Sequence, residues 1–191
     1  MGKRGLLVVI SSPSGGGKTT IIRKVLASGN GNFRYSISVT TRKRRLNEKN
    51  GHDYYFLSLD DFITKQKGGE FVEWAEVHGN YYATPKAQLE HWLTEGRIVF
   101  LDLDVDGGLE IKKKYRDSST LIFIKPPSFQ RLVQRLKERK TESQAQIDKR
   151  LERFPKEIMK SNSYDYCIVN ENLNKTVHEI IEIINRQIKN L

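Results

Sequence analysis

Three consecutive glycines followed by a lysine and two threonines make one segment of this 191-residue chain well suited to bind phosphate. Gly15, Gly16 and Gly17 have no Cβ, so their successive backbone N–H groups can converge on an anion. Lys18 adds a mobile positive charge for the β- and γ-phosphates of a nucleotide, and the Thr19 hydroxyl is a ligand for Mg²⁺. The segment therefore predicts a loop that binds nucleotide phosphates.

The flanking residues place this loop between a strand and a helix. Residues 6–10 are an apolar run typical of a buried strand, and residues 21–28 follow a helical pattern that Gly29 ends. The N-terminus of the helix then points its positive end at the phosphates. Ser12 stands where the pattern G-x-x-x-x-G-K-[ST] has its first glycine. An ordinary flexible connection is the alternative, but the order of strand, glycines and helix favours phosphate binding.

Two arginines and a tyrosine form a second candidate group. Arg42 and Arg45 lie three positions apart, and Tyr54 follows after a short polar segment. Together they can hold a phosphate through charge-assisted and bidentate hydrogen bonds. A solvated basic loop is the alternative, because runs of charge usually face water.

Two acidic segments supply candidate carboxylates. Glu73 lies in a β-rich run among aromatic residues, with Val72 expected on the opposite face, so its charge needs a partner. That partner is either an internal arginine or a donor on a ligand. Asp102 ends an apolar strand beside the phosphate loop, where a carboxylate steadies Mg²⁺ or its water shell. Asp106 is expected to cap a helix that begins at Gly107.

A further group consists of arginines at helical spacing, namely Arg131, Arg135, Arg139, Arg150 and Arg153. The last two follow a capping-box pattern, Thr141-x-x-Gln144. Arginines near a phosphate site can neutralise the charge that develops during phosphoryl transfer. A surface helix with i,i+4 ion pairs is the alternative for some of them.

The elements that must position these groups follow an α/β pattern with a mainly parallel sheet. Strands are expected at 5–11, 98–103, 120–125 and 166–170, and helices at 85–95, 128–139 and about 174–190. Residues 35–82 are β-rich and predict a small mixed sheet, to which Tyr35 should belong. We expect one domain with a core (1–34, 85–125 and 161–191) and two appendages. One is an insertion (35–84), and the other is a charged segment (126–160), called here the lid segment.

Composition narrows the class of protein. A formal net charge of +10, from 33 basic and 23 acidic residues, suits either nucleic acid or small polyanions such as nucleotides. The placement of the arginines favours nucleotides. The single cysteine, Cys167, permits no internal disulfide framework and is expected to be buried. No apolar run is long enough to span a bilayer and no signal peptide is evident, so we expect a cytoplasmic protein without membrane or nucleic-acid partners.

Taken together, the motifs resemble those of the guanylate kinase family, the P-loop nucleoside monophosphate kinases that act on GMP. The resemblance rests on the phosphate loop, Ser-x-Thr-Thr-Arg-x-x-Arg, Gly-x-Asp-Tyr-x-Phe, Glu-Trp-Ala-x-x-x-Gly-Asn-Tyr-Tyr, Leu-Asp-Leu-Asp, the arginine-rich segment and Asp-Tyr-Cys-Ile-Val-Asn. It implies a core, a GMP-binding insertion and a lid. It also implies transfer of the γ-phosphate of ATP to GMP, and to dGMP, with Mg²⁺, by a monomer or homodimer.

Site residues carry over motif by motif. For GMP, the resemblance implies Ser38, Arg42, Arg45, Tyr54, Glu73, Tyr82, Thr84 and Asp104. For ATP, it implies Ser12, Pro13, Ser14, Gly15, Gly16, Gly17, Lys18, Thr19, Thr20, Arg135, Arg139 and Asn170. Catalysis would fall to Lys18, Arg135, Arg139 and Arg150, and Mg²⁺ binding to Thr19 and, through water, Asp102. Ser12, Thr84 and Lys140 depart from the family pattern.

Two other classes of protein remain. Guanylate-kinase-like modules of scaffold proteins bind peptides without ATP chemistry, but the intact Gly17-Lys18-Thr19 favours an enzyme. A nucleic-acid-binding protein would show salt-sensitive duplex binding, and no groove-reading motif occurs here.

Overall fold

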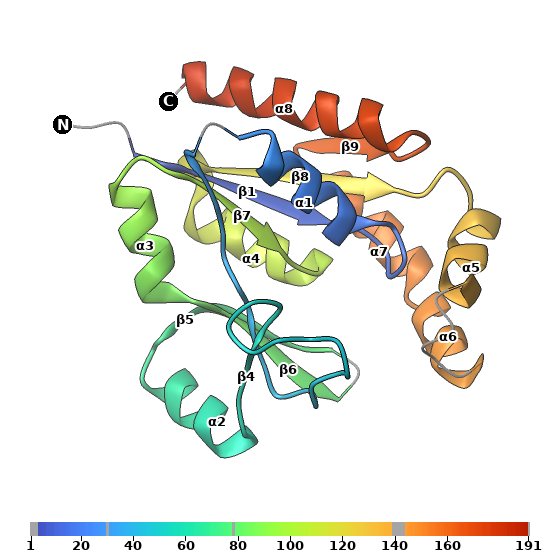
Figure 1. The fold of residues 1–191 in the computed structure, drawn as a ribbon, viewed down its shortest axis with the longest axis horizontal. Coiled ribbons are helices and arrows are strands. Elements are labelled where there is room, and N and C mark those ends of the chain that lie inside the picture. Colours follow the sequence, from blue (N-terminus) through green and yellow to red (C-terminus); the bar gives the residue numbers. More distant parts are fainter. Residues whose placement is uncertain (1–3, 30, 78, 139–143, 191) are drawn as a thin grey trace.

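Five parallel strands form the central sheet of the computed structural model, which describes residues 4–29, 31–77, 79–138 and 144–190. The strand order is β2-β7-β1-β8-β9 (Figure 1). The bounds are β1 Leu6–Ser11, β2 Phe33–Tyr35, β7 Ile98–Asp102, β8 Ser119–Lys125 and β9 Tyr166–Val169. The predicted α/β fold is confirmed, and the four predicted strands hold to within one residue at each end.

Helices cover both faces of this sheet, which explains the continuous apolar run in β1. Val8 and Ile10 face one cluster with α1 (Lys18–Ala27) and α8 (Leu173–Asn190). Val9 faces the opposite cluster, with α3 (Lys86–Thr94) and α4 (Val105–Lys114) (Figure 1). A central parallel strand buried on both faces has no polar side to alternate with its apolar one.

A second, four-stranded sheet has the order β4-β3-β6-β5 and is called here the small sheet. Its strands are β3 Val39–Thr40, β4 Tyr55–Phe56, β5 Phe71–Val77 and β6 Asn80–Pro85. Pair β3–β4 is parallel and the other pairs are antiparallel, so the predicted mixed sheet is confirmed. Helix α2 (Leu59–Lys67) packs on this sheet through Phe62. The β-rich pattern did not predict α2, because Phe62 is its one buried side chain.

The lid segment contains three helices, α5 (Phe129–Glu138), α6 (Gln144–Leu151) and α7 (Phe154–Lys160). They gather around Leu132, Leu136 and Ile147. Arg139, Lys140 and the predicted capping residue Thr141 lie outside the described residues. Short 3₁₀ turns occur at Arg116–Ser118 (η1) and Ser161–Ser163 (η2). Within the part of the chain that the structure describes, no helix is long and apolar enough to cross a membrane.

Two expectations about strands are wrong. Tyr35 belongs to β2 of the central sheet, where it pairs with Phe100, and not to the small sheet. The expected alternation of side chains between the two faces of β5 also fails, since Val72 and Glu73 are both buried. The register of β5 on β6 shifts between Phe71 and Trp74, which inserts an extra residue and turns adjacent side chains inward.

Two expectations about single residues are also wrong. The helix after β7 begins at Val105 and is capped by Asp104, whose Oδ1 accepts a hydrogen bond from the Gly107 N–H at 2.9 Å. Asp106 is instead exposed and pairs with Lys160. Cys167 is exposed, because β9 is an edge strand of the central sheet.

Close packing of α4 against β1 gives a test of the fold. A Cβ on Gly108 would lie 2.1 Å from the Oη of Tyr164, which is buried and bonded to Ser11 and Val105. We expect Gly108→Ala to lower the free energy of unfolding by about 1–3 kcal/mol, as overpacking does. The loss of stability caused by Gly108→Ala, measured by urea unfolding, should be smaller in a Tyr164→Phe background, which lacks the colliding oxygen.

The control for this test is Gly68→Ala at the end of α2. Gly68 has a φ of −73°, and a Cβ there meets no atom closer than 3.5 Å. That substitution should leave the stability equal or raised. An equal loss from Gly108→Ala in both backgrounds would show that the Tyr164 hydroxyl is not the obstacle.

Candidate active site

The loop between β1 and α1 has the backbone that its glycines predicted. Gly15 and Gly17 adopt φ values of 89° and 95°, in the left-handed region that favours glycine, and Gly17 is the N-cap of α1. Ser12 is buried, and its hydroxyl donates to the Pro13 carbonyl at 3.0 Å. A Cβ on Gly16 would lie 2.6 Å from that hydroxyl oxygen. Because Gly16 has no Cβ, the Ser12 side chain can occupy the space beside it.

Lys18 lies at the carboxyl end of the central sheet, where the loop meets the end of β7. Its Nζ is 3.1 Å from Asp102 Oδ1 and donates to the Leu103 carbonyl at 3.2 Å. Carboxyl ends of parallel strands meet at one edge of a sheet, which is why two segments so distant in sequence come together. These two oxygen atoms hold the Lys18 ammonium group at the position where a bound phosphate would supply oxygen atoms in their place.

The loop opens on a cavity of about 290 Å³. All loop residues from 12 to 19 line it. The region of the small sheet contributes predicted residues to its wall, namely Ser38, Arg42, Arg45, Tyr54, Glu73 and Tyr82. Asp102, Asp104 and Arg150 complete the set of predicted residues in the lining. Residues predicted from six separate motifs thus face one space.

Four described candidates do not line the cavity, and three of them contact residues that do. Thr84 donates a hydrogen bond to Glu73 at 2.6 Å, and Thr20 is exposed on α1. Arg135 lies 3.5 Å from the carbonyl oxygens of Gly16 and Asn170. The Asn170 side chain is buried and donates to the Gly16 carbonyl at 3.4 Å. The candidate Arg139 falls outside the described residues.

Glu73 and Asp104 form an acidic end of the cavity. Glu73 is 6% exposed, and burial raises the pKa of its carboxyl group to about 7, although the Thr84 hydroxyl opposes that shift. A Cβ on Gly107 would lie 3.0 Å from Glu73 Oε2 and 3.3 Å from Asp104 Oδ1, so the two carboxylates share one small space. The partner of Glu73 is therefore a hydroxyl and not an internal arginine, which leaves capacity for a ligand with N–H donors.

Arg42, Tyr54 and Tyr82 form a basic and aromatic wall. The Arg42 guanidinium lies over the Tyr54 ring, 5.4 Å from its centre, and the rings of Tyr54 and Tyr82 meet edge to face. Burial opposes the charge on Arg42, but a hydrogen bond to Glu48 and interactions with Tyr82 raise its pKa above the usual value. The wall is therefore positively charged and held in place.

The lid segment contacts the phosphate loop from the other side. Arg150 donates to the Ser14 hydroxyl at 2.5 Å, and a Cβ on Gly15 would lie 3.0 Å from the Leu136 side chain. Arg131 is exposed, does not line the cavity and donates to Gln134 on the same helix, so the surface-helix interpretation holds for that arginine.

Two charged residues of the lining were not among the site residues that the family motifs implied, although Arg153 belongs to the predicted group of lid arginines. Arg153 lies 3.9 Å from Asp104 Oδ2, and Glu157 faces the same space. Burial raises the pKa of Glu157 to about 7, while the nearby Lys18 and Arg153 lower it. For Glu157 the available signal was its i,i+4 spacing from Arg153, which equally fits an exposed ion pair.

Comparisons with known proteins agree with this geometry. The guanylate kinase family model matches residues 4–187. A guanylate kinase of Thermotoga maritima is 42% identical over 181 residues, which are 95% of this chain and 86% of the relative. A guanylate kinase of Bartonella henselae is 44% identical over 181 residues, or 95% of this chain and 81% of the relative.

A solved structure is similar over the whole fold. The crystal structure of guanylate kinase from Anaplasma phagocytophilum has a TM-score of 0.80 and 34% sequence identity. The match covers 98% of this chain and 88% of that chain. The chain therefore belongs to the guanylate kinase family.

Proposed function

We propose that this chain transfers the γ-phosphate of ATP to GMP, giving ADP and GDP, with the phosphates of the two nucleotides meeting in this cavity. Membership of the guanylate kinase family supports the reaction. The observation that carries the assignment of the site is the shared lining. One space is bounded both by the phosphate loop and by Arg42, Tyr54, Glu73 and Asp104.

ATP is proposed to bind at the phosphate loop, residues 12–20. Lys18 exchanges its contacts with Asp102 and the Leu103 carbonyl for phosphate oxygens. Arg135 and Arg150 already contact the loop or its supports, and the sequence motif adds Arg139. Asn170, which lies against the loop, is proposed to border adenine.

Mg²⁺ is proposed at Thr19 and, through water, at Asp102. Both side chains line the cavity, and a hydroxyl and a carboxylate are oxygen donors of the kind that Mg²⁺ prefers. Phosphate oxygens and water would complete the coordination. The bound ion neutralises charge on the phosphates.

GMP is proposed to bind with its base at the acidic end and its phosphate at the basic wall. Guanine N1–H and N2–H₂ are donors, which Glu73 and Asp104 can accept, whereas adenine lacks both. Thr84 orients the Glu73 carboxylate, and Ser38 lines the same end. Arg42, Arg45, Tyr54 and Tyr82 hold the phosphate. In this arrangement the base distinguishes GMP from other nucleotides, and the phosphate aligns GMP for the transfer.

The transfer step needs no general base. The attacking group is a GMP phosphate oxygen, which is already anionic at neutral pH. Catalysis then rests on aligning the two phosphates and on neutralising charge with Lys18, Mg²⁺ and the lid arginines.

Finer features follow from the family and are proposed with the reaction. They are acceptance of dGMP beside GMP, a monomeric or homodimeric state and a cytoplasmic location. The direct test of the reaction is an ADP-release assay in which ATP is offered with GMP, AMP, CMP, UMP or dTMP. Turnover confined to GMP supports the assignment, and preference for another nucleotide contradicts it.

Replacing Lys18 tests the phosphate loop. We expect Lys18→Ala to lower kcat by about 10² or more, because it removes a preorganised charge from the transferring phosphate. Lys24→Ala is the matched control, since Lys24 lies on the same helix and bonds to Asn174 away from the cavity. Turnover close to wild type in folded Lys18→Ala would refute the assignment.

Replacing Glu73 tests the base-recognition site. Glu73→Gln should reduce the ratio of kcat/KM for GMP over AMP at least tenfold, about 1.4 kcal/mol, because an amide accepts less well from guanine. Glu76→Gln on the same strand is the control, since Glu76 is exposed. An unchanged ratio in Glu73→Gln would assign Glu73 a structural role.

The raised pKa of Glu73 predicts pH-dependent binding of the base. Guanine donors bind the carboxylate form, so affinity for guanosine should rise about tenfold between pH 6 and 8 and then level off. Guanosine is used because the GMP phosphate itself titrates near pH 6. Calorimetry on Glu73→Gln should lack this dependence, which separates Glu73 from Glu157. The same slope in both proteins would contradict the prediction.

A further inference from the structure

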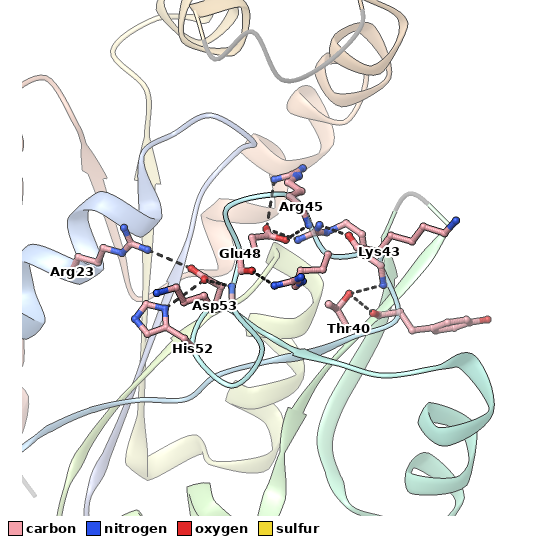
Figure 2. A network of polar contacts seen from close by, with 11 residues as sticks. Arg23, Thr40, Lys43, Arg45, Glu48, His52 and Asp53 are labelled. Carbon is pink, nitrogen blue, oxygen red and sulfur yellow. Dashed lines mark hydrogen bonds and ion pairs between the residues drawn. The ribbon is translucent and has the colours of Figure 1, made fainter.

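One carboxylate, that of Glu48, contacts both arginines proposed to hold the GMP phosphate. Its Oε1 accepts a hydrogen bond from Arg42 Nη2 at 2.7 Å, and its Oε2 accepts from the Arg45 backbone N–H at 2.8 Å. Figure 2 shows Glu48 directly beneath Arg45 in the connection between β3 and β4. Both Glu48 and Arg42 are mostly buried, with side chains 15% and 16% exposed.

The contacts of Arg42 fix its guanidinium on three sides. Glu48 holds Nη2, the Lys43 carbonyl accepts from Nη1 at 2.8 Å, and the Tyr54 ring lies against the planar face. A guanidinium has five N–H donors, so these contacts do not exhaust it. A fixed fork loses less conformational entropy when it binds a phosphate.

Backbone contacts extend the influence of Glu48 to the whole connection. The Arg45 carbonyl accepts from the Glu48 N–H at 3.1 Å, and the Glu48 carbonyl accepts from Arg44 Nη1 at 3.0 Å. Thr40 anchors the start of the segment by accepting from the Arg42 N–H. The connection from residue 41 to residue 54 contains no helix or named strand, so its shape depends on turn hydrogen bonds of the backbone and on side-chain contacts such as those of Glu48.

We propose that Glu48 is a positioning residue, which orients Arg42 and Arg45 as a preformed clamp for the phosphate of the GMP substrate. This inference rests on the proposed function, which places that phosphate at the two arginines. Glu48 itself touches no substrate atom. Its carboxylate is kept charged, since the hydrogen bonds from Arg42 and Arg45 lower its pKa although burial opposes them.

Glu48 also has an effect that opposes phosphate binding, and this effect defines the competing outcome of the experiment. A carboxylate 2.7 Å from Arg42 also cancels part of its charge, and its removal would then strengthen phosphate binding. We expect orientation to dominate, because Glu48 fixes one arginine by its side chain and the other by its backbone. The sign of the change in GMP affinity therefore decides between the two.

The experiment compares GMP with guanosine, which lacks the phosphate. Binding of each is measured by calorimetry with wild type, Glu48→Gln and Glu48→Ala. We expect GMP affinity to fall about tenfold in Glu48→Gln and further in Glu48→Ala, with guanosine affinity and KM for ATP unchanged within twofold. Glu48→Gln should be the milder, since its amide oxygen can still accept from the Arg45 N–H.

Asp53→Asn is the matched control. Asp53 lies in the same connection, where it accepts from the Lys49 N–H and faces Arg23 and His52 (Figure 2). The substitution removes the same charge without touching Arg42 or Arg45, so the ratio of GMP to guanosine affinity should stay at the wild-type value.

Arg42→Ala separates this inference from the proposed function. A lower ratio of GMP to guanosine affinity in Arg42→Ala with a normal ratio in Glu48→Gln would overturn the inference alone. A normal ratio in Arg42→Ala would overturn the proposed phosphate site as well. Equal weakening of GMP and guanosine by Glu48→Gln, or tighter binding of GMP, would also reject the positioning role.

Discussion

Cations assembled to bind phosphate repel one another while the site is empty, and the structure depends on how that repulsion is relieved. Two unit charges about 4 Å apart near a protein surface interact by about 4 kcal/mol. Each of three cavity cations lies beside a carboxylate. Lys18 pairs with Asp102, Arg42 with Glu48 and Arg153 with Asp104. These pairs let a strongly basic site fold before its anionic ligands arrive.

The carboxylates in the cavity, and that of Glu48 beside it, fall into groups with different chemistry. Those of Asp102 and Glu48 are paired with cations. Burial raises the pKa of Glu73 against the opposing effect of the Thr84 hydroxyl, and no cation of the described residues is bonded to its carboxylate. Asp104 both caps α4 and lies beside Arg153, which links the acidic end of the cavity to the lid segment.

Several features of the structure were predictable from single segments of the sequence. The phosphate loop, the apolar strands and the helices with one apolar face depend on residues close together in sequence, so local pattern determined them. The motifs also named most of the lining, including Arg42, Glu73 and Asp104. Glu48 was missed because a carboxylate in a polar segment has no local sign of which arginine it will meet.

The sequence by itself determined the fold class, four of the five strands of the central sheet and the chemical types that a phosphate site requires. Only the tertiary structure decided that Tyr35 joins the central sheet, that a bulge buries Glu73 beside Val72, and that Glu157 lines the same cavity as Lys18. Each of these outcomes depends on the packing of segments that are far apart in the chain. Local propensity carries no information on such contacts, because their energy arises only when the two surfaces meet.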